Sequence, residues 1–294
     1  MAEARQAQSE AQKAQSEAQQ APPGVDASRP SVARIYDSLL GGVNNFAADR
    51  AAAELMRSRA PELVDAAFAN RGFHQRAAKW IAEQGVRQFI DLGSGLPTVG
   101  NTHDVVRKVH PDARVVYVDI DPMVQLHSAR LLASDDAVDV VVADLKDPDA
   151  VLGSEAVRRL IDFRQPVAIM MTAVLHFVSD EDDPAGLVAR YVAPLARGSY
   201  VALSHTTADH KPPKAVEAMN EAGRRSAGGN YLRSRDQVRQ LAGSLEIVPP
   251  YDDALPEVTW VGLWGCEDPA AADSEGSRWL YCIVAAKRDD DAVG

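Results

Sequence analysis

The chain of 294 residues is poor in cysteine and has no long hydrophobic run. Its two cysteines, Cys266 and Cys282, are too few for a disulfide scaffold or a thiolate metal site. No stretch approaches the roughly 18 to 20 consecutive apolar residues that a membrane span requires, and the N-terminus has no apolar segment that could serve as a signal peptide. We therefore expect a cytoplasmic protein with no membrane partner.

Basic residues are also scarce relative to acidic ones. The chain has 31 Lys and Arg against 42 Asp and Glu, which gives a formal net charge of −11. Such a surface repels a phosphate backbone unless one face is locally basic, so nucleic acid is not an expected partner. The hydrophobic content of 46% and the charged content of 25% are those of an ordinary globular protein.

The sequence divides into four parts. Residues 1–30 form a leader rich in Ala and Gln, whose apolar side chains are too small to hold a coiled coil, and we expect it to be disordered. Residues 31–86 show helical periodicity and no strand signal, which predicts an N-terminal helical cap. Residues 87–288 form the core and residues 289–294 a solvated tail. Within the cap, the pattern predicts helices over 32–40, 47–59 and 61–84.

Beyond residue 86, short β-branched runs alternate with helical patterns. This succession predicts a parallel sheet covered by helices on both faces, which is a three-layer, Rossmann-like α/β fold. The strong final strand at 279–286 follows a long excursion, and we expect it to pair antiparallel at the sheet edge. The predicted parallel strands are 87–92, 114–118, 139–143, 167–171 and 200–203.

A glycine-rich motif follows the first predicted strand. Gly93 and Gly95 allow the backbone to approach a ligand next to the N-terminal amides of a helix. A dinucleotide site wants a third glycine where Thr98 stands, and Asp91 would repel a pyrophosphate. The motif therefore suits a cationic amino-acid group better than a phosphate, and an NAD(P)-dependent oxidoreductase is the less favoured alternative.

Acidic residues end the next two strands as well. Asp119 lies 24 residues beyond Gly95, close to the spacing of a carboxylate that accepts ribose hydroxyls. At the end of the third strand, Asp144 could accept a hydrogen bond from an adenine amino group while Leu145 covers the ring. A single strand-end Asp is more often a turn residue. Three of them at successive strand ends favour an adenosine ligand that bears no phosphate.

This constellation resembles the class I S-adenosylmethionine-dependent methyltransferases. Two further stretches, at 33–50 (ARIYDSLLGGVNNFAADR) and 93–103 (GSGLPTVGNTH), are similar to a bacterial S-adenosyl methyltransferase family long catalogued as a domain of unknown function. The resemblance covers about residues 31–288. It implies a methyltransferase-like sheet with the helical cap over an S-adenosylmethionine cofactor, and methyl transfer to an unidentified acceptor that we expect to be a small molecule. It also implies that the methionine end, the ribose and the adenine contact the three strand ends in that order.

The resemblance extends the set of expected cofactor contacts into the cap. An aromatic face and amide oxygens can hold a sulfonium cation, so Tyr36, Asn45 and Phe46 are candidates. The alternative is that Tyr36 and Phe46 are core residues and that Asp49 and Arg50 form a local ion pair. The full set of expected cofactor-binding residues is Tyr36, Asn45, Phe46, Asp91, Gly93, Gly95, Asn101, Asp119, Ile120, Asp144, Leu145 and Thr172.

Two histidines are candidates for catalysis. His176 follows the fourth strand and His205 ends the fifth, so either could serve as a general base for an oxygen or nitrogen acceptor. The alternatives are that these histidines are packed in the core and that proximity and desolvation suffice for methyl transfer. No metal is expected, since His103, Asp104 and His110 do not have the spacing of a metal site. A non-catalytic protein that binds S-adenosylmethionine or S-adenosylhomocysteine for regulation stays open, and the oligomeric state is not predicted.

Overall fold

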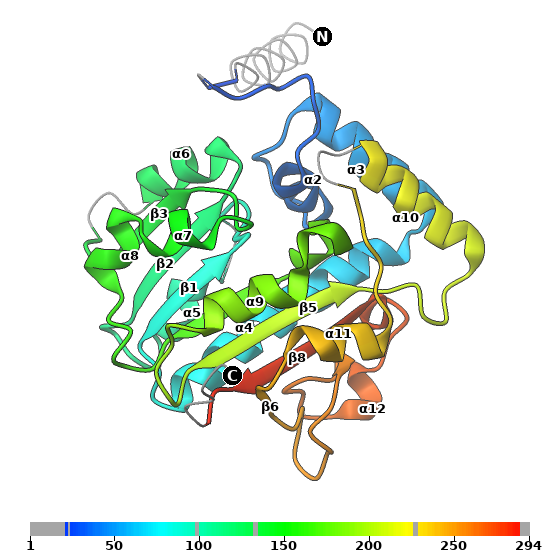
Figure 1. Cartoon of the computed structure of the whole chain (residues 1–294). Coiled ribbons are helices and arrows are strands. Elements are labelled where there is room, and N and C mark those ends of the chain that lie inside the picture. The colour runs from blue at the N-terminus through cyan, green and yellow to red at the C-terminus, as the bar shows by residue number, and fades with distance from the viewer. Residues whose placement is uncertain (1–20, 23, 98–99, 132–134, 226–228, 289–294) are drawn as a thin grey trace, which may run out of the picture.

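The computed structural model shows one twisted sheet with helices on both faces and a helical cap at one end (Figure 1). Thr98, the first part of the predicted leader and the predicted tail lie outside the described residues. In the part of the chain that the structure describes, no helix is both long and apolar enough to cross a membrane. The described residues are 21–22, 24–97, 100–131, 135–225 and 229–288.

The sheet has the strand order β3-β2-β1-β4-β5-β8-β6, and the short β7 also pairs with β8. The five predicted strands are present and parallel, and β8 runs antiparallel to β5 as predicted. The expectation that this last strand forms the sheet edge is wrong, because β6 and β7 pair with its other side. The strands are β1 (Gln88–Leu92), β2 (Arg114–Asp119), β3 (Val138–Val142), β4 (Ala168–Thr172), β5 (Tyr200–Thr206), β6 (Glu246–Ile247), β7 (Thr259–Trp260) and β8 (Leu280–Ala286).

Alternate side chains of the strands enter two cores. Ile90 and Val116 face a cluster that includes side chains of α7, α8, α9 and α11. Phe89 and Val115 face the other cluster, which includes side chains of α4 and α5. This alternation is the period of two that a sheet buried on both faces requires. The helices beyond the cap are α5 (Thr102–Val106), α6 (Pro122–Leu131), α7 (Pro148–Leu152), α8 (Glu155–Leu160), α9 (Pro184–Val192), α10 (Pro213–Arg225), α11 (Arg235–Leu241) and α12 (Pro269–Ala272), with 3₁₀ turns η1 (Leu175–Phe177), η2 (Asp180–Asp182) and η3 (Ser277–Trp279).

The three helices predicted for the N-terminal part are present. They are α2 (Val32–Leu39), α3 (Ala47–Arg59) and α4 (Glu62–Glu83). Phe73, Ala77 and Ile81 place α4 directly against the sheet, where all three side chains are fully buried. By contrast, α2 and α3 lie beyond the carboxyl ends of the strands, and α10 packs beside α3 (Figure 1). The helix α4 is thus a layer of the core, and α2 and α3 are what covers the strand ends.

The second part of the predicted leader is ordered. Ala21, Val25 and Ala27 pack against a buried cluster of cap and α6 side chains, and the guanidinium of Arg34 donates to the backbone carbonyls of Asp26 (3.2 Å) and Arg29 (2.7 Å). The expectation of disorder is therefore wrong for residues 21–22 and 24–30. Small apolar side chains suffice here because a buried arginine fixes the backbone that carries them.

Candidate functional site

The glycine-rich loop follows β1 at the point where the strand order reverses, which is where open α/β sheets bind ligands. Gly93 and Gly95 have φ values of 68° and 66°, a left-handed conformation that favours glycine. A Cβ on Gly93 would also lie 2.3 Å from Cγ2 of Val174, just after β4. The loop therefore requires glycine at 93 for both its backbone conformation and the close approach of the β4 segment.

The carboxylate of Asp119 ends β2 beside this loop. Its Oδ2 accepts from the backbone N–H of Gly95 (2.8 Å) and its Oδ1 from that of Asp121 (2.9 Å). Burial raises the pKa of Asp119, and these backbone hydrogen bonds oppose the rise. Each carboxylate oxygen has a second lone pair for a further donor, such as a hydroxyl. The next side chain, Ile120, is 66% exposed and presents an apolar surface beside that carboxylate.

The end of β3 lies at the same edge, because β2 and β3 are parallel neighbours. Asp144 is half-buried and accepts from the backbone N–H of Lys146 at 2.9 Å. Leu145 packs on the core, and its carbonyl accepts from the hydroxyl of Tyr191 at 2.8 Å. The structure therefore brings Asp119, Ile120, Asp144 and Leu145 to one rim, in the arrangement that the strand-end argument expects.

A buried hydrogen-bond chain links Asp91 to α4 and β4. Thr102 Oγ1 donates to Asp91 Oδ2 (2.6 Å) and lies 2.8 Å from His74 Nε2, while His74 Nδ1 lies 2.9 Å from Thr172 Oγ1. Because the hydroxyl proton of Thr102 points to Asp91, Thr102 accepts from Nε2–H and Nδ1 accepts from Thr172. His74 is not among the site residues that the sequence predicts. In the sequence it is one polar residue on the buried stripe of a helix.

Burial shifts the pKa values of Asp91 and His74 in this hydrogen-bond chain. It raises the pKa of Asp91 to about 6, although the hydrogen bond from Thr102 and the charge of Arg71 act in the opposite direction. It lowers the pKa of His74 to about 3, so this imidazole is neutral at pH 7. The hydrogen-bonded group of Asp91, Thr102, His74 and Thr172 therefore carries one negative charge at neutral pH, on Asp91 at the end of β1. A carboxylate in this setting suits a cationic group such as an α-ammonium.

The three candidate cap residues make their contacts within the protein. The hydroxyl of Tyr36 donates to the carbonyl of Ala67 (2.9 Å) and accepts from Asn70 Nδ2 (3.1 Å). The amide nitrogen of Asn45 donates to Asp37 Oδ2 (2.8 Å) and to the carbonyl of Gly42 (2.9 Å). Phe46 is buried in one cluster with Leu96 and Met123, which joins the cap to the glycine-rich loop and α6. These contacts agree with the packing alternative for Tyr36 and Phe46.

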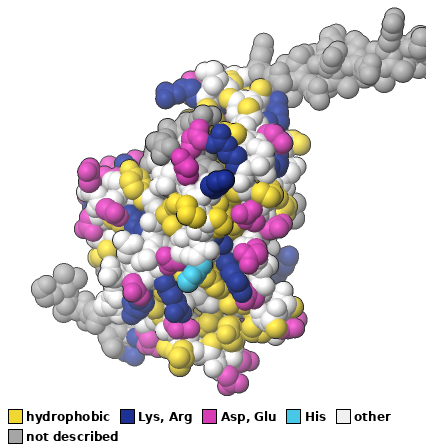
Figure 2. Space-filling model, turned by 90° about the vertical axis from the view of Figure 1, so that its right-hand side faces the viewer, with side chains coloured by type: hydrophobic (Ala, Val, Ile, Leu, Met, Phe, Trp, Pro, Cys, Tyr) yellow, Lys and Arg dark blue, Asp and Glu magenta, His cyan; other side chains and the backbone are white. Residues whose placement is uncertain are grey.

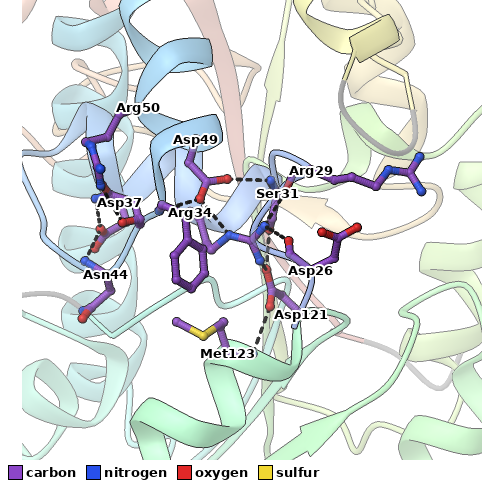
Figure 3. Close-up of polar contacts among 12 residues, drawn as sticks. Asp26, Arg29, Ser31, Arg34, Asp37, Asn44, Asp49, Arg50, Asp121 and Met123 are labelled. Atoms are coloured by element: carbon purple, nitrogen blue, oxygen red, sulfur yellow. Dashed lines mark hydrogen bonds and ion pairs between the residues drawn. The ribbon is translucent and has the colours of Figure 1, made fainter. Parts of the chain in front are cut away.

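An ion-pair network connects the cap to the end of β2 (Figure 3). Arg34 Nε lies 2.9 Å from Asp49 Oδ2, and Arg34 Nη1 lies 3.1 Å from Asp121 Oδ2. The hydroxyl of Ser31 also donates to Asp121. The alternative ion pair between Asp49 and Arg50 is wrong, because Arg50 donates to Asn45 instead. Since the backbone of Asp121 donates to Asp119, the network fixes the loop that holds the expected ribose carboxylate.

The two candidate catalytic histidines have different surroundings. His205 is fully buried, its Nδ1 lies 2.8 Å from the carbonyl of Thr206, and its Nε2 lies 2.8 Å from Arg233 Nη1. Because both ring nitrogens are engaged, the expected role of His205 as a base does not fit this geometry. His176 is 6% exposed, and its ring packs 4.1 Å from that of Phe177. Burial lowers the pKa of His205 to about 4 and that of His176 well below its ordinary value.

Several buried polar atoms in the described part of the chain have no hydrogen-bond partner. Among the described residues they are Arg71 Nε, Ser94 Oγ, His176 Nδ1 and Trp264 Nε1. Three of these four belong to segments around the strand ends: α4, the glycine-rich loop and η1. Such atoms are rare in folded proteins, so each has the capacity to hydrogen-bond to a bound molecule such as a ligand or a water. The described residues contain no cluster of His, Cys, Asp or Glu that could hold a metal.

Comparison with known proteins identifies the family of the chain. Residues 18–288 match the family model described as S-adenosyl methyltransferase. The crystal structure of a candidate methyltransferase from Thermobifida fusca YX is similar at 40% identity and a TM-score of 0.84, over 91% of this chain and 98% of that one. A DUF574 family protein from Streptomyces avermitilis MA-4680 is similar at 37% identity and a TM-score of 0.82, over 89% and 99%. No curated protein sequence matches the chain. The chain therefore belongs to the S-adenosyl methyltransferase family, and S-adenosylmethionine is its cofactor.

Proposed function

We propose that this methyltransferase acts on a small-molecule acceptor that enters beside His176 and Phe177. The observation that carries the proposal is the buried Nδ1 of His176, which has no partner among the described residues. Its segment follows β4, so it lies at the same end of the sheet as the strand-end acids. A buried nitrogen that can accept a hydrogen bond suits an acceptor hydroxyl or amine.

The cofactor roles follow the strand ends. Asp119 would accept the ribose hydroxyls, and Ile120 and Leu145 would cover the adenine while Asp144 accepts from its amino group. Asp91 would hold the methionine ammonium, with Gly93 and Gly95 giving the backbone close access to that end. Asn101 and Thr172 stand beside the same chain of contacts, since Asn101 Oδ1 accepts from Arg71 Nη2 and the Thr172 hydroxyl meets His74. Tyr36, Asn45 and Phe46 would hold the cap over the ligand.

A weak base is sufficient for this chemistry. S-adenosylmethionine would supply the methyl group and leave as S-adenosylhomocysteine, and the proton of the acceptor would pass to His176 as positive charge develops on the attacking atom. A neutral His176 can therefore accept the proton even though burial holds its pKa well below the ordinary value. Before transfer, the same nitrogen orients the acceptor by a hydrogen bond. Positioning and exclusion of water supply the remainder of the rate enhancement.

Surface charge favours a small acceptor over a nucleic acid. On the face of Figure 2, basic and acidic side chains are interspersed, with no continuous basic stripe. Together with the net charge of −11, this face offers little attraction to a phosphate polymer. A small acceptor that reaches a buried histidine needs no such attraction. A soluble substrate of this kind also agrees with the cytoplasmic location that we propose for the protein.

Replacing His176 by asparagine is expected to lower the methyl-transfer rate roughly 100- to 10,000-fold, because the acceptor loses its proton acceptor. Binding of S-adenosylhomocysteine, measured by calorimetry, is expected to stay unchanged. The measurement is transfer of a labelled methyl group from S-adenosylmethionine into the small-molecule fraction of a bacterial extract. The matched control is His210→Asn, which changes an exposed histidine and is expected to behave as wild type.

Three outcomes would count against the proposal. Equal turnover by His176→Asn and the wild type would remove the role of this histidine. Label found only in macromolecules would contradict the small-molecule acceptor. Tight binding of S-adenosylhomocysteine by the wild type without turnover on any fraction would favour a regulatory binding protein over an enzyme.

A further inference from the structure

One face of α4 is polar where it meets the strand ends. Asn70 and Arg71 each lie about one helical turn before His74, and each of the three contacts a segment that carries site residues. Asn70 accepts from Ser204 at the end of β5, and His74 meets Thr172 at the end of β4. Arg71 reaches Asn101, just beyond the glycine-rich loop. The sheet-covering helix α4 therefore also lines one side of the site.

Arg71 has donor capacity that the protein does not use. Its Nη2 donates to Asn101 Oδ1 at 3.3 Å, near the limit for a hydrogen bond. Its Nε is buried and has no hydrogen-bond partner among the described residues. A guanidinium presents five N–H donors in a planar fork that matches the two oxygens of a carboxylate. Leaving such a donor buried and unsatisfied is costly, and a bound carboxylate would remove that cost.

The carboxylate of Asp91 lies near Arg71. Arg71 is close enough to Asp91 for its charge to act on that carboxylate, yet the ion pairs of the described residues include none between them. Both groups can therefore pair with a ligand that carries one positive and one negative charge. An α-amino acid end carries both charges on groups attached to one carbon, and its ammonium would face Asp91 while its carboxylate faces Arg71. This combination satisfies both side chains at once.

We propose that Arg71 binds the α-carboxylate of the cofactor and makes the site selective for ligands that keep the whole amino-acid end. This inference rests on the proposed placement of the methionine end at Asp91. It assigns to α4 a residue that neither the glycine-rich motif nor the strand-end acids include. It also separates two ligand classes by one group: adenosyl compounds with an α-carboxylate and those without it.

The test compares two ligands on the purified full chain. S-adenosylhomocysteine has the amino-acid end, whereas 5′-methylthioadenosine keeps the adenosine and sulfur and lacks it. In Arg71→Gln, the affinity for S-adenosylhomocysteine measured by calorimetry is expected to fall roughly 10- to 100-fold, the range of a charge-assisted hydrogen bond. The affinity for 5′-methylthioadenosine is expected to stay within about threefold, since Arg71 does not contact the shared part.

Two further variants separate binding from folding. Arg71→Lys keeps the charge without the fork and is expected to recover part of the lost affinity. Arg87→Gln is the matched control, since it removes an arginine near the opposite end of β1, where Arg87 pairs with Asp112. Thermal unfolding and circular dichroism of each variant check that the fold is intact.

The outcomes distinguish this inference from the function on which it rests. Unchanged binding of S-adenosylhomocysteine by Arg71→Gln would overturn the role of Arg71 and leave the methyltransferase assignment intact. An equal loss for both ligands would also overturn it, because the arginine would then act on the whole site. Failure of the wild type to bind either ligand would instead overturn the proposed cofactor placement.

Discussion

Replacing Arg34 by methionine is expected to lower the free energy of unfolding by about 3–5 kcal/mol. Arg34 is 4% exposed, and its guanidinium lies between Asp49, which is fully buried, and Asp121, which is 7% exposed. Methionine fills much of the same volume but leaves two buried carboxylates without their counter-charge. Burying an unpaired charge is among the few causes of so large an effect from one substitution.

The measurement is urea unfolding at pH 7.5, followed by circular dichroism. Arg50→Met is the matched control, because Arg50 is an exposed arginine in the first turn of α3 and its side chain donates to Asn45 and to no carboxylate among the described residues. The triple variant that adds Asp49→Asn and Asp121→Asn to Arg34→Met is expected to regain part of the loss, since no unpaired charge stays buried. A change below about 1 kcal/mol in Arg34→Met would show that water reaches the two carboxylates.

The same substitution should be felt at the cofactor site. Asp121 accepts from Arg34 through its side chain and donates to Asp119 through its backbone. Loss of the guanidinium is therefore expected to weaken the binding of S-adenosylhomocysteine through the position of Asp119. The cap and the proposed ribose site are thus coupled through Asp121, in the loop between β2 and α6.

The strand-end acids could be predicted because their position follows from a simple rule. Parallel strands place their carboxyl ends at one edge, so an Asp after each of three apolar runs had to meet at one rim. The glycine-rich loop could be predicted for a similar reason, since Gly93 is required by both its φ and the approach of Val174. Local sequence determines these features, and the structure adds only the distances.

The residues of α4 could not be predicted in this way. The helical pattern identifies the apolar stripe that faces the sheet, but the roles of Asn70, Arg71 and His74 depend on how far α4 extends past the ends of β4 and β5. That register is a tertiary quantity. The two histidines show the same limit. The sequence places both near strand ends, but it does not show that Arg233, from a distant segment, contacts Nε2 of His205.

Partner choice within the cap was also beyond the sequence. Asp49 and Arg50 are adjacent in the chain, and adjacent positions on a helix point in different directions. The observed partner of Asp49 is Arg34, which lies in the preceding helix α2. A neighbouring charge in sequence is therefore a poor guide to an ion pair, whereas burial of both groups would have identified it.

Replacing Asp91 by asparagine is expected to stabilise the fold while it weakens the cofactor site. Burial raises the pKa of this carboxyl from 3.8 in the unfolded chain to about 6, so the folded state favours the protonated form. Above pH 6 the ionised carboxylate therefore costs stability, about 3 kcal/mol when fully developed. The cost decreases as the pH falls through 6 toward 4. Asparagine has the same shape, can still accept from Thr102, and carries no charge at any pH.

Urea unfolding of the wild type and Asp91→Asn at two pH values tests this sign. The variant is expected to be more stable by about 3 kcal/mol at pH 8 and by about half of that at pH 5. The contributions of the buried His176 and His205, which titrate in both proteins, cancel in the difference. The matched control is Asp252→Asn, an exposed position where the change is expected to stay within about 0.5 kcal/mol at both pH values.

Ligand binding by the same variant tests whether the Asp91 carboxylate contributes to the cofactor site. At pH 8 the variant is expected to bind S-adenosylhomocysteine roughly 10- to 100-fold more weakly, because the ligand ammonium loses a charged partner. A variant that is destabilised equally at both pH values would contradict the raised pKa, and one that binds the ligand as tightly as wild type would remove Asp91 from the site. A gain in stability together with a loss of binding would show that the fold keeps an unfavourable buried charge because the cofactor needs it.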